Sequence, residues 1–339
     1  ALAAGLLLLF AACNSDTAGL SSESPLAADS ALAASDSMLP VDSALVASDS
    51  VPGEPSSTGE AGGTILEATS QFPGITHATY GLDTPLLSSV QTGTLRGGGV
   101  TESSIGSLLS GIRAKGGRVI LKLCNGKDSY VKNSDGTFSF TKWKSLVSRF
   151  KNSNLGPYIA DGTIIGHFLI DEPQRAAKWG GKIIPPSTLE AMGQYSKQLW
   201  PGMTTFVRAE PVWLESTSTT FRYVDAGWAQ YASGKGDPGS WIAAQVAAAK
   251  RKGLGLAVGL NVLDGGNGSS RIAGWSKGKY AMSATEIRTY GGAMLNQSYS
   301  CAYYNWMYDA TYYGRSDIKS AMADMATKAK AHVRTACNQ

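Results

Sequence analysis

The chain has 339 residues, of which 43% are hydrophobic, so it has enough apolar side chains to bury a sizeable core. Residues 1–62 contain eight of the 26 acidic residues and neither Lys nor Arg, which leaves 18 acidic and all 30 basic residues for the rest. No dense Lys/Arg run accompanies this basic excess, so we expect a dispersed, solvated charge and no nucleic-acid partner. Three histidines and the absence of CxxC spacing argue against a zinc site, and we expect neither a metal nor another cofactor.

The first 13 residues have the pattern of a signal peptide. An apolar run from Leu6 to Phe10 is too short to span a bilayer as a helix, and it leads through two alanines into Cys13. The segment from Phe10 to Cys13 resembles the lipobox of bacterial lipoproteins, which implies that Cys13 is lipidated and anchors the chain to a membrane. In that resemblance Asn14 favours the outer membrane. The alternative is an ordinary cleaved signal peptide, so we expect either a lipid-anchored protein of the cell envelope or a secreted one.

Residues 14–62 consist mainly of Ser, Ala, Asp, Pro and Gly. Such a composition buries too little apolar surface to offset the chain entropy lost on folding, so we expect a disordered tether. A tether behind a lipid anchor would hold the following domain away from the membrane. We therefore place a single folded domain at residues 63–339 and expect it to be a monomer.

From residue 75 onward, short apolar runs alternate with helical patterns. Seven runs predict strands, at residues 76–82, 118–123, 163–170, 204–208, 223–229, 256–261 and 300–306. Six segments predict helices, at residues 102–115, 141–151, 186–199, 241–252, 283–296 and 317–334. This alternation predicts an α/β fold with parallel strands and right-handed crossovers, and seven or eight such units fit a (β/α)8 TIM-like barrel. We expect irregular first strands, with the remaining strand near residues 65–69 or within 156–159.

Two cysteines lie where a bridge would fix the end of the chain. Cys301 is on the last predicted strand, and Cys337 lies near the end of the last predicted helix. In an oxidising compartment a disulfide between them would pin the C-terminus. The sequence leaves the bridged and the free state open.

Polar and aromatic side chains follow the predicted strands, where a parallel barrel gathers its functional groups. Carboxylates that transfer protons, amides that bind hydroxyl groups and indoles that stack on pyranose rings are typical of a sugar site. The candidates are Asp171, Glu172, Arg208, Glu210, Trp228, Gln230, Asn261, Asp264, Trp306 and Asp309.

The apolar strand at residues 163–170 leads directly into Asp171-Glu172-Pro173. This motif resembles the fourth strand of a large clan of (β/α)8-barrel glycoside hydrolases, in which Asn-Glu-Pro supplies the general acid/base. The resemblance implies that Glu172 is the proton donor. Asp171 replaces the clan's Asn, so it either contacts a sugar hydroxyl or acts as a like charge beside Glu172.

The clan's nucleophilic Glu follows the seventh strand, where this chain has none. Asp264 is the nearest carboxylate there, and Glu210 is the other candidate for nucleophile or base. Trp306, at the end of the eighth strand, resembles the clan's sugar platform. The remaining candidates, which we expect to bind the substrate, are Asp171, Arg208, Trp228, Gln230, Asn261 and Asp309.

The leading hypothesis is therefore a glycoside hydrolase that acts on a polysaccharide or oligosaccharide, and the basic domain favours an acidic glycan as one option. The alternative is a non-catalytic carbohydrate-binding surface lipoprotein that has lost its second carboxylate. A third hypothesis is an adhesion protein whose aromatic rim contacts another protein. The sequence lacks a GxSxG elbow, a dinucleotide fingerprint and a P-loop, which argues against those chemistries.

Overall fold

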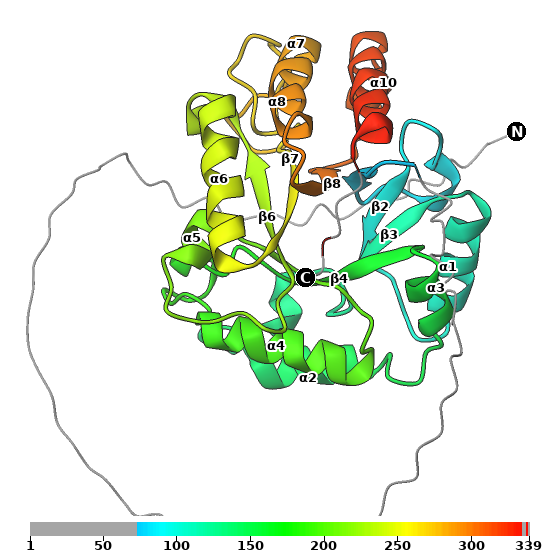
Figure 1. Ribbon diagram of the computed structural model, residues 1–339, viewed down its shortest axis with the longest axis vertical. Helices are drawn as coiled ribbons and strands as arrows, with labels where there is room; N and C mark the ends of the chain where they lie inside the picture. Colours follow the sequence, from blue (N-terminus) through cyan, green and yellow to red (C-terminus); the bar gives the residue numbers. More distant parts are fainter. Residues whose placement is uncertain (1–72, 334–336, 338–339) are drawn as a thin grey trace, which may run out of the picture. The chain divides into compact units, whose positions relative to one another are not determined.

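The computed structural model describes residues 73–333 and Cys337 (Figure 1). The chain divides into two units, Ala1–Gly63 and Thr64–Gln339, and every described residue belongs to the second. Its strands form a closed barrel in which neighbours are parallel and β8 pairs with β1. In chain order they are β1 (Thr76–Tyr80), β2 (Gly93–Arg96), β3 (Arg118–Leu121), β4 (Ile164–Asp171), β5 (Thr205–Arg208), β6 (Ala226–Tyr231), β7 (Gly255–Leu260) and β8 (Ser300–Asn305). The fold is thus the predicted (β/α)8 barrel. The predicted signal peptide, lipidation site and tether lie outside the described residues.

Helices connect the strands and surround the barrel (Figure 1). The α-helices are α1 (Ile105–Ala114), α2 (Phe140–Ser148), α3 (Gly156–Ala160), α4 (Pro186–Leu199), α5 (Pro211–Glu215), α6 (Pro238–Lys252), α7 (Ala284–Glu286), α8 (Gly292–Leu295), α9 (Ala310–Gly314) and α10 (Ser316–Ala331). Short 3-10 turns are η1 (Thr84–Leu86), η2 (Asp128–Val131), η3 (Ala176–Lys178) and η4 (Ser233–Lys235), and a π-helical turn, η5 (Ile287–Gly291), joins α7 to α8. Within residues 73–333, none of the helices is both long enough and apolar enough to cross a membrane.

Capping residues set the ends of the helices. Before α6, the Asp237 carboxylate accepts a hydrogen bond from the backbone N–H of Ser240 at 2.7 Å, and Pro238 occupies the first helical position. The same helix ends at Gly253, whose φ of +68° is a left-handed conformation that glycine adopts without steric cost. Ser283 and Glu286 form a reciprocal capping box at the start of α7.

The strand that the sequence analysis missed is β2. We expected it near residues 65–69, which lie outside the described residues, or within 156–159, and the second expectation is wrong because that segment belongs to α3. β2 has only four residues and begins with Gly93, which disfavours a strand prediction. The packing requires that glycine, because a Cβ there would lie 2.4 Å from Cγ2 of Thr76.

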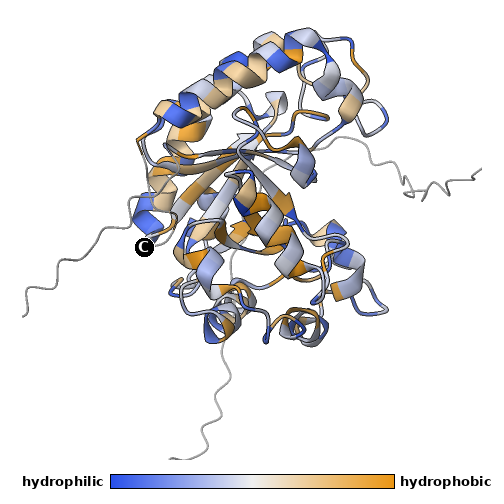
Figure 2. Cartoon of the chain, turned by 90° about the vertical axis from the view of Figure 1, so that its right-hand side faces the viewer, coloured by the Kyte–Doolittle hydropathy of each residue, from blue (hydrophilic) through white to orange (hydrophobic). Residues whose placement is uncertain are grey.

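Large aromatic side chains fill the barrel interior. Phe168, Phe206, Trp228 and Tyr304 are each at most 3% exposed and belong to one cluster inside the strands. Figure 2 shows hydrophobic residues in the centre of the fold, and hydrophobic and hydrophilic residues in alternation along the surrounding helices. The interior is therefore a packed core, which leaves the barrel ends as places for chemistry.

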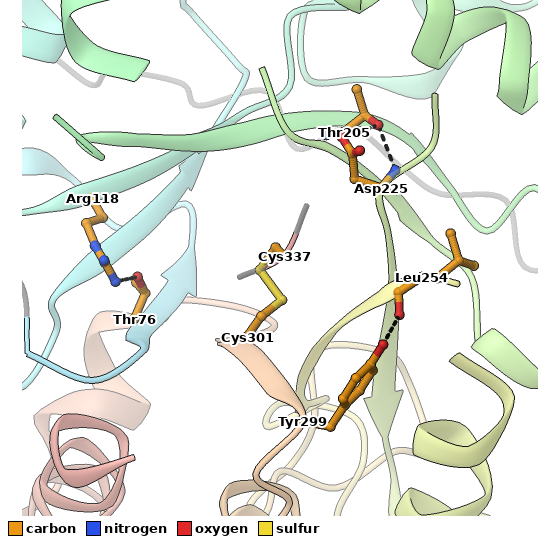
Figure 3. The surroundings of a disulfide bond; sticks show 8 residues. All are labelled: Thr76, Arg118, Thr205, Asp225, Leu254, Tyr299, Cys301 and Cys337. Carbon is orange, nitrogen blue, oxygen red and sulfur yellow. Dashed lines mark hydrogen bonds between the residues drawn. A yellow bond between two sulfur atoms is a disulfide. The ribbon is translucent and has the colours of Figure 1, made fainter. Parts of the chain in front are cut away.

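A disulfide between Cys301 and Cys337 lies at the amino end of the barrel, with the two Cα atoms 5.2 Å apart (Figure 3). Residues at the starts of strands surround it, including Thr76, Arg118 and Thr205. Cys337 packs against the interior cluster, and a Cβ at Gly255 would lie 2.4 Å from the Cys337 carbonyl oxygen. Of the two states that the sequence left open, the structure has the bridged one, which ties the end of the chain across this opening.

Candidate functional site

The carboxyl ends of β4 to β7 surround a cavity of about 270 Å³. Six of the residues predicted from sequence line it, namely Glu172, Arg208, Glu210, Trp228, Gln230 and Asn261. This is the end of the barrel at which enzymes of this fold carry their active sites. Gln174, Arg175 and Lys235, which the sequence analysis did not select, contribute polar groups to the same lining.

Glu172 has an unusual backbone conformation directly after β4. Its φ of +48° is in the left-handed region, which costs a residue with a Cβ of the order of 1 kcal/mol or more. Its N–H donates to the Arg208 carbonyl oxygen at 3.0 Å, so pairing with the next strand holds the backbone in place. Strained residues of this kind concentrate at functional sites. The backbone therefore singles out the same residue as the sequence motif.

Arginine side chains hold the Glu172 carboxylate. Nη2 of Arg208 lies 2.7 Å from one oxygen, and Nη1 of Arg175 lies 2.8 Å from the other. Nζ of Lys178 is 3.7 Å from the second oxygen. The Glu172 side chain is only 16% exposed, so these contacts fix its orientation inside the cavity.

Asp171, the last residue of β4, supports this arrangement through cations that also contact Glu172. It lies opposite Arg208 in the register of β4 and β5, and it forms ion pairs with Arg208 and Lys178. Burial would raise the pKa of Asp171, but the positive charges of Arg208, Lys178 and Lys122 outweigh it and hold the pKa well below its usual range. Asp171 is therefore ionised at neutral pH, with its charge neutralised by cations.

Lys122 and Asp128, which do not line the cavity, extend the ion-pair network. Asp128 accepts from Nζ of Lys122 at 2.8 Å and is 2.7 Å from Nζ of Lys178. Burial would lower the pKa of Lys122, but the neighbouring Asp128, Cys124 and Asp171 raise it above its usual value. The sequence analysis missed both residues, although a charged residue directly after the apolar strand β3 was a usable signal. Burial raises the pKa of the Cys124 thiol to about 11, so it is a poor nucleophile at neutral pH.

Glu210 follows β5 and supplies the second carboxylate of the cavity. One oxygen is ion-paired with Lys235, and the other accepts a hydrogen bond from Nε2 of Gln245 at 3.2 Å. Glu210 lies at the position before Pro211, the first residue of α5. Because β4 and β5 are adjacent strands, Glu172 and Glu210 enter the cavity from neighbouring positions on the barrel rim.

Trp228 and Gln230 bring buried donors to the cavity. Trp228 is 3% exposed and packs edge-on against Phe168 and Tyr304, with ring centroids 5.7 Å apart in both pairs. Oε1 of Gln230 accepts from Nη1 of Arg208 at 3.0 Å. Nε1 of Trp228 and Nε2 of Gln230 have no hydrogen-bond partner within the part of the chain that the structure describes. Both nitrogens are buried, so a bound molecule could reach them only after a neighbouring side chain moves.

Four predicted site residues do not line this cavity: Asp171, whose ion pairs are described above, and Asp264, Asp309 and Trp306. The Asp264 carboxylate accepts hydrogen bonds from the backbone N–H and the hydroxyl of Ser276, at 2.9 and 2.6 Å. Asp309 caps α9 by accepting from the N–H of Tyr312 at 2.7 Å, and it lines a separate cavity. Trp306 follows β8, precedes a cis peptide bond to Met307, and packs against the hydrophobic cluster outside β6 to β8. The structure therefore assigns supporting contacts to Asp264 and Asp309.

Groups of three or more His, Cys, Asp or Glu side chains that could hold a metal ion are absent from residues 73–333. The chemistry available in the cavity is that of two glutamates, three cations and several amide or indole donors.

No protein-family model and no curated protein matches the chain. Among solved structures it is similar to a β-glucanase from Saccharophagus degradans, with a TM-score of 0.50 and 10% identity over 76% of this chain and 88% of that one. A GH113 β-1,4-mannanase gives a TM-score of 0.47 with 10% identity, over 76% and 99% of the two chains. A GH18 chitinase from Pseudoalteromonas aurantia gives 0.43 with 14% identity, over 73% and 98%. The closed parallel barrel and the likeness to the β-glucanase show that this chain has the (β/α)8-barrel fold found in glycoside hydrolases.

Proposed function

We propose that this domain is a glycoside hydrolase whose catalytic residues are Glu172 and Glu210. The observation that carries the proposal is the cavity that the two carboxylates share at the carboxyl ends of β4 and β5. Most retaining and inverting glycosidases use two carboxyl groups that flank the scissile bond. The position of the cavity on the barrel agrees with that use.

The unpartnered donors in the cavity suit a carbohydrate. Nε1 of Trp228 and Nε2 of Gln230 are buried, and an unpaired buried donor costs about 1–3 kcal/mol. Once a neighbouring side chain moves and exposes them, sugar hydroxyl groups and ring oxygens would accept hydrogen bonds from both groups. The cations in the lining, Arg175, Arg208 and Lys235, would additionally favour a sugar that carries a carboxylate or sulfate.

In the proposed reaction Glu172 donates a proton to the glycosidic oxygen as the bond from that oxygen to the anomeric carbon breaks. Glu210 either removes a proton from the attacking water or attacks the anomeric carbon itself, after which water releases the sugar. Both glutamates contact cations in the structure, Glu172 through two arginines and Glu210 through Lys235. Substrate binding must therefore exchange an arginine contact of Glu172 for the glycosidic oxygen. The exposed Arg175, whose side chain is 60% accessible, is the partner that can move.

A second candidate function is carbohydrate binding without catalysis. The observation that favours it is that both oxygens of Glu172 already contact guanidinium groups, while Asn261, an amide, follows β7. In that case the cavity would hold a sugar through its donors and would leave the glycosidic bond intact.

The test compares the wild-type chain with Glu172→Gln and Glu210→Gln on soluble β-glucan, β-mannan, colloidal chitin and polyuronate, and measures new reducing ends. We expect the wild type to hydrolyse at least one of these polysaccharides and each variant to lose at least about 100-fold in turnover, since proton transfer contributes 10²–10⁴-fold. Glu215→Gln is the matched control, because Glu215 is ion-paired with Arg251 and does not line the cavity. Wild-type binding without new reducing ends would support the second candidate, and a fully active Glu172→Gln variant would contradict the first.

We further propose that the domain works outside the cytoplasm on a lipid anchor at Cys13. The lipobox-like segment and the Cys301–Cys337 disulfide support this location, since structural disulfides persist in oxidising compartments. Metabolic labelling with a fatty acid in a bacterial host tests the anchor. Label should enter the wild-type chain and be absent from Cys13→Ala, and equal labelling of both would contradict lipidation at this residue.

A further inference from the structure

An exposed tryptophan lies on the loop between β7 and α7. The backbones of Ala273 and Tyr280 form an antiparallel bridge, which closes residues 273–280 into a compact hairpin-like turn, here called the Trp275 turn. Trp275 is 63% exposed within this turn, and Tyr280 at its base is 46% exposed. Tryptophan is usually well buried, and an exposed indole beside a cavity is a common feature of binding surfaces.

The Trp275 turn is held firmly by its own contacts. Asp264 accepts two hydrogen bonds from Ser276, the residue after Trp275, at 2.9 and 2.6 Å. The N–H of Gly274 donates to the Lys279 carbonyl oxygen at 2.7 Å, and the N–H of Lys279 donates to the Ser276 carbonyl oxygen at 3.0 Å. A Cβ at Gly274 would lie only 2.7 Å from the Asp264 carboxylate, so the close approach requires glycine. Asp264 is therefore a positioning residue for the indole.

A second cavity of about 230 Å³ lies beside the indole. Trp275 forms part of its wall, and Asp309, Thr311 and Arg315 bring a carboxylate, a hydroxyl and a guanidinium to the same space. Leu263 and Tyr312, which are at most 4% exposed, provide an apolar base. An aromatic face next to mixed donors and acceptors suits a sugar ring, which has apolar C–H faces and a polar edge.

The second cavity is adjacent in the chain to the first. Asn261 lines the first cavity, Leu263 lines the second, and the N–H of Asp264 donates to Oδ1 of Asn261 at 3.0 Å. Both cavities therefore lie at the carboxyl end of β7, on either side of one short turn. A polymer held in the first cavity has a second polar and aromatic surface within reach.

We propose that the Trp275 turn and the cavity beside it form a second carbohydrate-binding site, which takes a sugar unit of the same glycan chain that occupies the first cavity. Trp275 stacks on the ring, and Asp309, Thr311 and Arg315 hydrogen-bond to its hydroxyl groups. This inference rests on the proposed carbohydrate chemistry of the first cavity, and it identifies the ligand as a polymer of several sugar units. A single sugar would not contact both cavities.

Native affinity electrophoresis tests the proposal with soluble β-glucan, β-mannan, chitosan or polyuronate embedded in the gel. The parent protein is the full chain carrying Glu172→Gln, which prevents hydrolysis during the run. We expect at least one polysaccharide to retard the parent, and Trp275→Ala added to the parent to raise the apparent Kd about tenfold. Trp275→Tyr, which keeps an aromatic ring, should retain most of the binding. Tyr158→Ala is the matched control, because Tyr158 is an aromatic residue on α3, which precedes the start of β4 at the other end of the barrel.

Equal retardation of the parent and the Trp275→Ala variant would overturn the proposal, as would the absence of retardation in every gel. Self-association of the chain that Trp275→Ala abolishes, without glycan binding, would identify a second copy as the occupant and overturn it too. Hydrolysis is measured separately with the Glu172-containing protein. Retardation that depends on Trp275 without any new reducing ends would leave this site standing while the hydrolase proposal fails. Hydrolysis by the Glu172-containing protein, together with binding that Trp275→Ala does not weaken, would support the hydrolase proposal and overturn the second binding site.

Discussion

Replacement of Arg208 by Met should both destabilise the domain and release one oxygen of the Glu172 carboxylate from its ion pair. Arg208, the last residue of β5, contacts Asp171 and Glu172 and donates to Gln230 at 3.0 Å, so one side chain organises three residues at the ends of β4 and β6. Its side chain is 19% exposed. Methionine has a similar length and apolar stem but no charge, so the variant removes the ion pairs and keeps most of the volume.

The size of the loss in unfolding free energy depends on which carboxylates lose an ion-pair partner. Breaking a buried ion pair by removing one partner costs about 3–5 kcal/mol. Asp171 retains Lys178 and Glu172 retains Arg175, so the expected loss lies at the lower end, about 3 kcal/mol. Arg251→Met is the control, because Arg251 is 62% exposed in its pair with Glu215 and should contribute far less.

Denaturant unfolding at several pH values measures this loss. The pKa of Asp171 is lowered in the folded state, so its contribution to stability is fully present above the unfolded pKa of about 3.9 and is lost as the pH falls through the lower folded value. The difference between wild type and Arg208→Met should therefore be full at pH 7 and shrink as the pH falls below about 4. A loss no larger than that of Arg251→Met, or a difference independent of pH, would refute the role assigned to Arg208.

Three further variants follow from the same structure. Loss of the disulfide in Cys301→Ser/Cys337→Ser should lower the free energy of unfolding by about 4 kcal/mol, because the bridge closes a loop of 36 residues. Turnover should stay intact, since the bridge lies at the end of the barrel opposite the cavity. A loss of under about 1 kcal/mol in denaturant unfolding would contradict this expectation. Asp264→Asn should weaken polysaccharide retardation as Trp275→Ala does and lower kcat less than about tenfold, whereas a fall of about 10³-fold or more would favour Asp264 as a catalytic group. Gly93→Val should lower the free energy of unfolding, measured by thermal melting, by about 2 kcal/mol or more, because its Cβ would lie 2.4 Å from Cγ2 of Thr76. Gly98→Ala is the control, and its stability should stay close to that of the wild type because the space around its Cβ is open.

Most of the barrel could be predicted because its strands and helices carry strong local patterns. The segment 163–170 is almost wholly apolar and became β4, and the helix predicted at 186–199 has those bounds as α4. β2 could not be found, since four residues beginning with Gly93 show neither length nor a β-rich composition. Its strand conformation comes from pairing with β1 and β3, which are distant contacts that a local pattern does not contain. The helix predicted at 283–296 is interrupted by the π-helical turn η5, which no residue pattern announced.

The site could be predicted in part, because the strand order fixes which ends meet. The motif at Asp171 and Glu172 led to the cavity. Glu210, which follows β5, and Trp228 and Gln230, which lie within β6, also line it. What the sequence could not give is the partner of each charge. Asp264 was a candidate nucleophile because it is the carboxylate nearest the end of the seventh strand, but its oxygens accept hydrogen bonds from Ser276 of the same loop. Lys122, Asp128 and Lys178 come from separate elements, and their network is visible only in three dimensions.

The role of Glu172 as proton donor is tested most directly by the dependence of kcat on the leaving group. Glu172→Gln should be compared with wild type on the polysaccharide found in the panel and on an aryl glycoside of the same sugar with a dinitrophenolate leaving group, which departs without protonation. We predict that the variant loses about 10³-fold on the polysaccharide and no more than about tenfold in bond cleavage on the aryl glycoside, because only the first needs the acid. Equal losses on both substrates, or no loss on either, would contradict catalysis by Glu172 in this cavity.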